Sequence, residues 1–378
     1  MALPFLCKVA LVSVRFLVKL EGVRRSILSW LVQTSMSMDI LERQVDDYEQ
    51  VVFARDEACG YRGIIAIHNT ALGPAVGGTR LWNYASDEEA LADVLRLARG
   101  MTYKNALAGL PFGGGKSIII GDGRTIDREA IFRAHGRFVE TFGGRYITAE
   151  DVGTSTADMD FVRLETRHVA GLADRSGDPS PATARGVFRA LQASAKHRWG
   201  SESLAGRTVA LQGCGHVGFN LARELHRAGA RLVVADIDAA RVERVVTEFD
   251  ATAVAPAEIY SVRADIFAPC GLGGIINDET VPQLAVEIVA GAANNQLLAA
   301  RHGDALEARG ILYAPDYVAN AGGMINGCIE LIGWSRTEAA DKIERIYDTL
   351  LAVFRLAREA GIPTYQAADE LAERRFSA

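Results

Sequence analysis

The segment from Arg207 to Gly218, RTVALQGCGHVG, decides the fold. Its first half is a short apolar run that predicts a strand, and its second half, GCGHVG, has the spacing GxGxxG before an expected helix at 217–228. That spacing alone is weak evidence, because glycines cluster in many turns. Between a strand and a helix it is strong evidence, since the backbone can approach a pyrophosphate while the helix N-terminus offers N–H groups. We therefore expect a dinucleotide site that includes Gly213, Gly215, His216, Val217 and Gly218.

An acid follows the next expected strand, which covers residues 231–235. Asp236 stands where a carboxylate accepts a hydrogen bond from the adenosine ribose 2′-hydroxyl and repels a 2′-phosphate. The sequence therefore favours NAD over NADP.

Further strand and helix units follow in order. Strands are expected at 265–269 and 287–291, before the loops CGLGG and AANNQ, and such loops gather at the carboxyl ends of a doubly wound sheet. The segment 177–186, GDPSPATARG, is interpreted as a hinge, in which Ser180 or Thr183 could cap the next helix. We expect an α/β chain with a Rossmann domain at 182–336.

Composition sets the broad class. A chain of 378 residues predicts about two domains, and 49% hydrophobic with 23% charged residues is typical of a globular protein. A net charge of -6 argues against a nucleic-acid partner. Five scattered cysteines indicate reduced thiols in the cytoplasm, and the histidines include no HExxH pair, so no metal is expected.

Residues 1–37 do not fit the rest of the chain. Lys8, Arg15 and Lys19 interrupt the apolar residues, so no run reaches the ~20 residues needed to span a membrane. A targeting peptide or a basic amphipathic segment is possible. We favour an extension outside the fold that arises from an upstream start codon.

A second segment, 101–121 (MTYKNALAGLPFGGGKSIIIG), carries two lysines, Lys104 and Lys116. A solvated lysine titrates near pH ~10.4, whereas one desolvated beside another cation is pushed toward neutrality. Two surface lysines near a turn are the alternative. The glycines before Lys116 and the isoleucines after it favour a working residue at the start of a buried strand.

Two more segments carry polar groups. The loop LGPAVGG contains Gly77 and Gly78, whose N–H groups could hold a carboxylate. In YITAEDVGT, Asp151 follows a short strand, where helix capping is the alternative role. Asn294 and Asn295 lie in the loop AANNQ and could be simple turn residues.

The motifs MTYKNA, GGGK, GGTR and YITAEDVGT resemble the amino-acid dehydrogenase family of the leucine, valine and phenylalanine enzymes, with the glutamate enzymes as distant relatives. The resemblance covers about residues 38–375. It implies reversible, NAD-dependent oxidative deamination of an L-amino acid by a homo-oligomer, often an octamer. It also implies a substrate-binding and oligomerisation domain at 38–181, to which the C-terminal helices at about 337–378 also belong.

Residue roles come from the same resemblance. It implies Lys116 as general acid/base with Asp151 as its partner, and Lys104 on the substrate carboxylate with help from the N–H groups of Gly77 and Gly78. It implies that Asn294, Asn295 and Thr183 contact the cofactor or the substrate. The implied side-chain pocket consists of Val76, Ala149, Met324 and Gly327.

That pocket contains no charge to pair a glutamate side chain, and burying an unpaired carboxylate costs several kcal/mol. The expected substrates are leucine, valine and isoleucine. Phenylalanine is the alternative, because Gly327 stands where branched-chain enzymes tend to carry a β-branched residue. A non-catalytic NAD-binding sensor would need neither lysine, and a 2-hydroxy-acid dehydrogenase would need a histidine and arginine pair that does not stand out.

Overall fold

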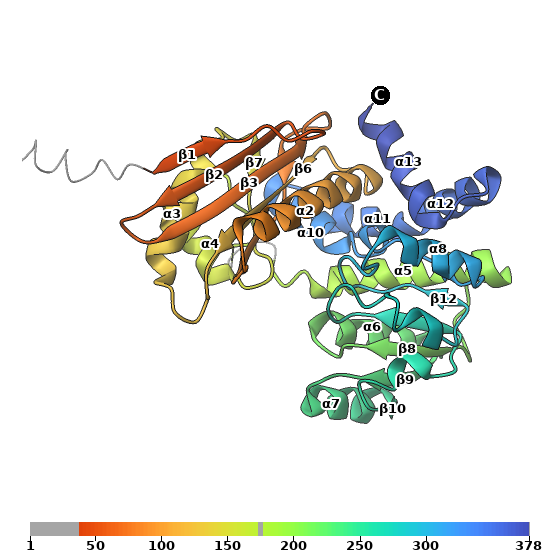
Figure 1. Cartoon of the computed structure of the whole chain (residues 1–378). Coiled ribbons are helices and arrows are strands. Elements are labelled where there is room, and N and C mark those ends of the chain that lie inside the picture. Colours follow the sequence, from red (N-terminus) through yellow and green to blue (C-terminus); the bar gives the residue numbers. More distant parts are fainter. Residues whose placement is uncertain (1–37, 173–176, 378) are drawn as a thin grey trace, which may run out of the picture.

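The computed structural model describes residues 38–172 and 177–377, so the expectation for residues 1–37 lies outside it. The described chain forms two sheets, each with its own helices, and the two halves lie side by side (Figure 1). The expected α/β class with a Rossmann half is confirmed. The proposed boundary between residues 181 and 182 stays a prediction.

The first sheet is mixed and has the order β1-β2-β3-β6-β4-β7, with β5 also paired to β6. Its strands are β1 (Asp39–Glu42), β2 (Gln50–Asp56), β3 (Tyr61–Asn69), β4 (Ala75–Val76), β5 (Thr79–Trp82), β6 (Gly113–Ile120) and β7 (Tyr146–Ile147). Three helices accompany it, namely α2 (Asp87–Leu107), α3 (Arg128–Glu140) and α4 (Thr156–Arg163).

Helices cover both faces of this sheet. Because side chains alternate along a strand, Ile64 of β3 packs in one cluster with Val94 of α2, and Ile65 packs in another with Phe132 of α3. Ile118 and Ile119 of the neighbouring strand β6 divide between the same two clusters, so both faces of β6 are covered, and Lys116 lies in its middle.

Two element ends place the two lysines in the fold. Helix α2 begins after the cap Ser86 and continues to Leu107, so Lys104 lies in its last turn. Strand β6 begins at Gly113, so Lys116 lies within the strand and not at its start. The glycines serve close packing, because a Cβ on Gly113 would meet Asn69 O at 2.1 Å and one on Gly114 would meet Thr102 N at 2.0 Å.

The second sheet is parallel throughout, in the order β10-β9-β8-β11-β12-β13. This doubly wound order places the switch point between β8 and β11. Its strands are β8 (Thr208–Gln212), β9 (Arg231–Ala235), β10 (Thr252–Ala253), β11 (Ile266–Pro269), β12 (Ile288–Val289) and β13 (Leu312–Tyr313). Its helices include α5 (Ser180–Trp199), α6 (His216–Arg227), α7 (Ala239–Phe249) and α8 (Ala300–Ala308), with short 3₁₀ turns at Ile259–Ser261 and Val281–Gln283.

The expected cap of α5 is wrong. The helix begins after Pro179 with no side-chain cap, and the Thr183 hydroxyl donates to Pro179 O at 3.0 Å. Proline at the start of the helix already fixes the backbone there and lacks an N–H that would need a partner.

Five helices complete the chain, namely α9 (Asp316–Ala319), α10 (Gly322–Leu331), α11 (Arg336–Glu344), α12 (Ile346–Ala360) and α13 (Thr364–Phe376). Helices α11 and α12 pack against α5, and α13 packs against α2. The rings of Tyr103 and Phe376 lie 5.5 Å apart, and Arg375 donates to the last carbonyls of α2. Through α13, the end of the chain is thus joined to the helix that carries Lys104.

Candidate active site

A buried charge cluster lies on β6 and its neighbours. Lys116 Nζ is 2.9 Å from Asp151 Oδ2, and Arg80 Nε of β5 is 3.3 Å from the same oxygen. Burial alone would raise the pKa of Asp151, but the Lys116 ammonium and the Arg80 guanidinium outweigh it and lower that pKa to about 2. Asp151 is therefore ionised at neutral pH.

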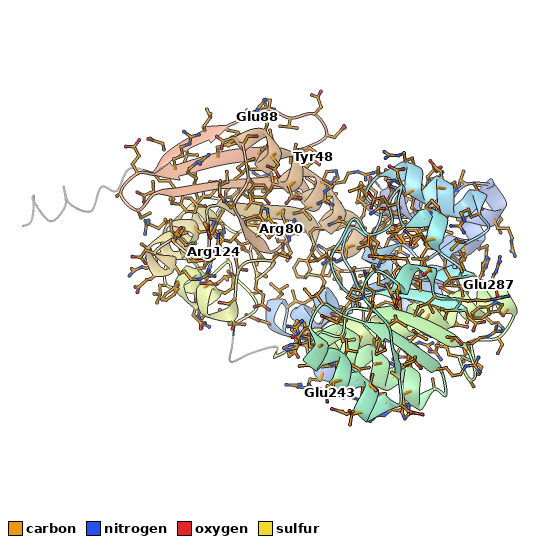
Figure 2. All side chains as sticks on the ribbon, turned by 60° about the horizontal axis from the view of Figure 1, so that its bottom comes forward. Tyr48, Arg80, Glu88, Arg124, Glu243 and Glu287 are labelled. Atoms are coloured by element: carbon orange, nitrogen blue, oxygen red, sulfur yellow. The ribbon has the colours of Figure 1, made fainter. Side chains whose placement is uncertain are left out.

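Sequence reasoning missed the role of Arg80, which it used only as part of the motif GGTR. Arg80 Nη1 also lies 2.8 Å from Asp93 Oδ2, so it joins β5, α2 and the segment that follows β7. Figure 2 labels Arg80 and Tyr48 in the first-sheet half and Glu243 and Glu287 in the other half. The register of β5 beside β6, with Arg80 opposite Ile118, places the guanidinium near Lys116, and the sequence carries no signal for that pairing.

Lys104 reaches across to the second half. Its Nζ donates to Asn294 Oδ1 at 3.2 Å, and the same oxygen accepts from Asn320 at 2.9 Å. Desolvation lowers the pKa of Lys104 to about 8, opposed by Asp316 and aided by the charge of Lys116. The two lysines are thus close enough to interact, as expected.

The N–H of Gly77 is not available to a carboxylate, contrary to expectation. It donates to Ile147 O at 3.2 Å, where β4 runs beside β7. A Cβ on Gly77 would lie 1.8 Å from Gly115 O, and one on Gly78 would lie 2.5 Å from Glu150 O. These glycines let three strands approach closely beside Lys116, and only Gly78 is left as a candidate amide donor.

The four expected pocket residues come from two parts of the fold. Val76 is buried on β4 and Ala149 follows β7, whereas Met324 and Gly327 lie half-buried on α10. A Cβ on Gly327 would meet nothing nearer than Leu331 Cδ1 at 4.0 Å, so the helix leaves open space there. The carboxylate of Glu330 accepts from Gly171 N at 3.0 Å and links α10 to the first half.

The glycine-rich loop fits a dinucleotide. Gly213 has φ +94°, and a Cβ on Gly218 would lie 1.9 Å from Gly213 O, so both positions require glycine. A Cβ on Gly215 would meet only Arg241 Nη1 at 3.8 Å, which leaves the backbone open where α6 begins. His216 starts that helix with an exposed side chain, and Val217 packs against the core behind it.

Asp236 follows β9 and is fixed by its own loop. Its carboxylate accepts from Cys214 N at 2.6 Å and from Asp238 N at 2.9 Å. Asn295 has φ +52° and its N–H donates to Asp316 at 2.8 Å, so it does occupy a turn position. The loops after β8, β9 and β12 therefore meet at the carboxyl edge of the second sheet, where Lys104 also arrives.

Metal-binding and membrane-spanning features are both absent from residues 38–172 and 177–377. These ranges contain no group of three or more metal-binding side chains with suitable placement. No helix in the same ranges is long and apolar enough to cross a membrane.

Known proteins resemble most of this chain. The model "Glu/Leu/Phe/Val dehydrogenase, dimerisation domain" matches residues 46–168, and "Glutamate/Leucine/Phenylalanine/Valine dehydrogenase" matches 176–240 and 234–377. Leucine dehydrogenase of Geobacillus stearothermophilus is 58% identical, covering 87% of this chain and 91% of the relative. Valine dehydrogenase of Streptomyces coelicolor is 49% identical, with coverages of 87% and 92%.

Solved structures agree. The crystal structure of L-tryptophan dehydrogenase from Nostoc punctiforme matches with a TM-score of 0.77 and 47% identity, over 88% of this chain and 96% of that one. A hetero-hexameric glutamate dehydrogenase from Thermus thermophilus has a TM-score of 0.71 at 24% identity, over 94% and 95%, and shows the shared fold.

Proposed function

Because the chain belongs to the Glu/Leu/Phe/Val dehydrogenase family, we propose that it catalyses the reversible oxidative deamination of L-leucine, L-valine and L-isoleucine with NAD. The chain is an amino-acid dehydrogenase that uses a nicotinamide cofactor. The products are a 2-oxo acid, ammonium and NADH. The observation that carries the proposal is the buried pair of Lys116 and Asp151 close to a second lysine, Lys104.

The cofactor supplies the hydride acceptor when it is bound. Gly213, Gly215 and Gly218 would hold its pyrophosphate at the start of α6, and Asp236 would hold the adenosine ribose. Thr183 and Asn294 are proposed near its nicotinamide end. The open backbone at Gly215 and the crowded backbone at the other two glycines support this assignment.

The protein side chains bind the substrate and move protons. Lys104 would hold the substrate carboxylate by a charge-assisted hydrogen bond, with Gly78 N–H beside it. Lys116 would take a proton from the water that attacks the imino carbon and return one to the departing amine. Asp151 stays ionised and holds the Lys116 ammonium whenever that lysine carries the proton.

The first prediction concerns pH. Lys104 has a pKa of about 8, so it is charged below that pH and loses its charge above it. The KM for a 2-oxo acid such as 4-methyl-2-oxopentanoate should therefore rise as the pH passes through about 8, because the carboxylate loses its cation. Steady-state reduction with NADH and saturating ammonia measures this. Lys104→Arg, which stays charged, should move the rise to higher pH, and an identical profile would contradict the assignment.

The second prediction concerns the cofactor. The wild type should use NAD and barely use NADP, because Asp236 would repel a 2′-phosphate. In Asp236→Ser, NADP should gain at least tenfold in relative kcat/KM, since Arg241 lies near the same loop and could pair with the phosphate. Asp250→Ser, at the end of α7, is the matched control. Equal use of both cofactors by the wild type would contradict the proposal.

The third prediction separates substrates. Leucine, valine and isoleucine should have higher kcat/KM than phenylalanine, and glutamate should be inactive because Val76, Ala149, Met324 and Gly327 bear no charge. One methylene changes selectivity by only ~1–3 kcal/mol, so the margin over phenylalanine is small. A preference for phenylalanine above tenfold would mean that the space at Gly327 decides the substrate.

We also propose a homo-oligomer, an octamer, in the cytoplasm. The match of residues 46–168 to a family model described as a dimerisation domain supports assembly. Strand β1 lies at the edge of the first sheet and exposes Ile40 and Leu41, which is the kind of surface that a second copy covers. Light scattering after size exclusion gives the number of copies.

A further inference from the structure

A cavity lies beside the helices that carry proposed active-site residues. It has a volume of about 370 Å³ and is formed where the end of α2 meets α9, α10, α11, α12 and α13. Its walls include Leu107, Val318, Ala321 and Ile325, which are apolar and buried. It shares no residue with the dinucleotide loop or with the cluster of Lys116, Asp151 and Lys104.

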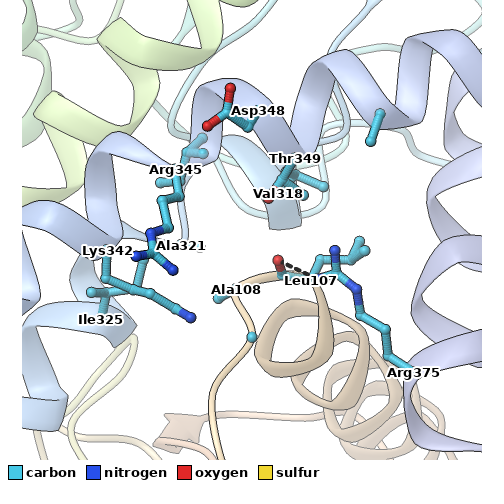
Figure 3. A pocket seen from close by; sticks show the side chains of 13 residues that line it. Leu107, Ala108, Val318, Ala321, Ile325, Lys342, Arg345, Asp348, Thr349 and Arg375 are labelled. Atoms are coloured by element: carbon cyan, nitrogen blue, oxygen red, sulfur yellow. Dashed lines mark hydrogen bonds between the residues drawn. The ribbon is translucent and has the colours of Figure 1, made fainter. Parts of the chain in front are cut away.

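Three cations open onto this cavity. Figure 3 shows Lys342 and Arg345 on one side and Arg375 on the other. Arg375 donates to the carbonyls of Ala106 and Leu107, at 2.8 and 2.7 Å. In residues 38–172 and 177–377, no carboxylate lies within ion-pair distance of Lys342, Arg345 or Arg375, although Asp348 stands at the rim.

These cations repel one another. Desolvation, followed by the charges of Arg345 and Arg375, lowers the pKa of Lys342. Gly109, with φ +62°, leaves the space that the ammonium of Lys342 occupies, since a Cβ there would lie 2.9 Å from Nζ. A bound anion would relieve this repulsion.

We propose that this cavity binds a small organic phosphate, with the phosphoryl group among Lys342, Arg345 and Arg375 and the apolar part against Val318, Ala321 and Ile325. Three cations match a dianion better than a single carboxylate. The volume exceeds what a phosphate ion alone needs, so the cavity can also accommodate the organic part of the molecule.

The cavity adjoins two helices that carry proposed active-site residues, so a ligand bound there can influence catalysis. Ala321 is the residue directly before α10, and Ile325 lies in the first turn of that helix. The same helix carries Met324 and Gly327. Leu107 ends α2 one turn after Lys104. A ligand between these two helices would change how they pack, and hence the KM for the amino acid. The expected change in this KM rests on the proposed function, whereas the binding of the phosphate does not.

Calorimetric titration of the full chain tests binding, with saturating NADH so that the dinucleotide site is filled. The probes are phenyl phosphate and inorganic phosphate. We expect phenyl phosphate to bind the wild type, inorganic phosphate to bind several-fold more weakly, and the double variant Lys342→Met with Arg345→Gln to lose at least tenfold in affinity. Arg358→Gln, an exposed cation farther along α12, should bind like the wild type.

Three results would overturn the proposal. They are no binding of phenyl phosphate, equal binding by the wild type and the double variant, and equal affinity for the two probes. The unliganded double variant serves as its own folding check, because removing the repulsion should leave its Tm equal to or above that of the wild type. If phenyl phosphate binds and the KM for the amino acid does not change, the cavity is a binding site without a regulatory role. That result would contradict only the expected change in KM.

Discussion

Replacing Lys116 with alanine should lower kcat by roughly 10²–10⁴-fold, the range that a general acid/base contributes. The lysine lies within β6 beside Asp151, and no other lysine in the described chain lies within ion-pair distance of that carboxylate. The dinucleotide loop belongs to the other sheet, so the affinity for NADH should stay within about twofold of the wild type.

Single-turnover and steady-state kinetics, with NADH fluorescence for binding, measure both quantities. Lys196→Ala, an exposed lysine on α5, is the control and should retain full activity. Breaking a buried pair costs about 3–5 kcal/mol when the remaining charge has no other partner. Arg80 stays beside Asp151, so the variant should remain folded. An active Lys116→Ala enzyme would contradict the proposed mechanism.

Asp151→Asn should lower kcat by roughly 10²-fold or more, within the same general acid–base range. The change keeps the size of the side chain and removes the charge that faces both Lys116 and Arg80. Two buried cations would then lack their common anion, and proton transfer through Lys116 would lose its partner. The affinity for NADH should again be unchanged.

The matched control is Asp122→Asn, which removes a half-buried carboxylate paired with Arg124 and should leave kcat unaltered. The pH profile separates a chemical role from a structural one. In the wild type the pKa of Asp151 is held at about 2, so its own titration lies far below the working range. Activity within tenfold of the wild type in Asp151→Asn would show that Lys116 works without this carboxylate.

The Rossmann half can be predicted from the sequence because its signals are local. Gly218 is crowded by the backbone of Gly213, five residues before it, and Asp236 follows its strand directly. The fold class and the family therefore follow from the amino-acid sequence alone, as does the close approach of Lys104 and Lys116.

The contacts that depend on strand register cannot be predicted in this way. Arg80 reaches Asp151 only because β5 pairs with β6, and the N–H of Gly77 donates to Ile147 only because β4 pairs with β7. Helix α2 also continues through Gly100 to Leu107, because tertiary packing outweighs the cost of about 1 kcal/mol for one glycine in a helix. The cavity beside Arg375 combines segments more than two hundred residues apart, which no local pattern reveals.

The most direct test of the central claim follows the hydrogen on the substrate. The enzyme is incubated with NAD and L-leucine that carries deuterium at Cα, and the NADH is analysed by mass spectrometry. The proposed reaction predicts one deuterium in each NADH formed, together with release of one ammonium. NADH without deuterium, or no NADH from leucine at all, would contradict oxidative deamination by hydride transfer from Cα.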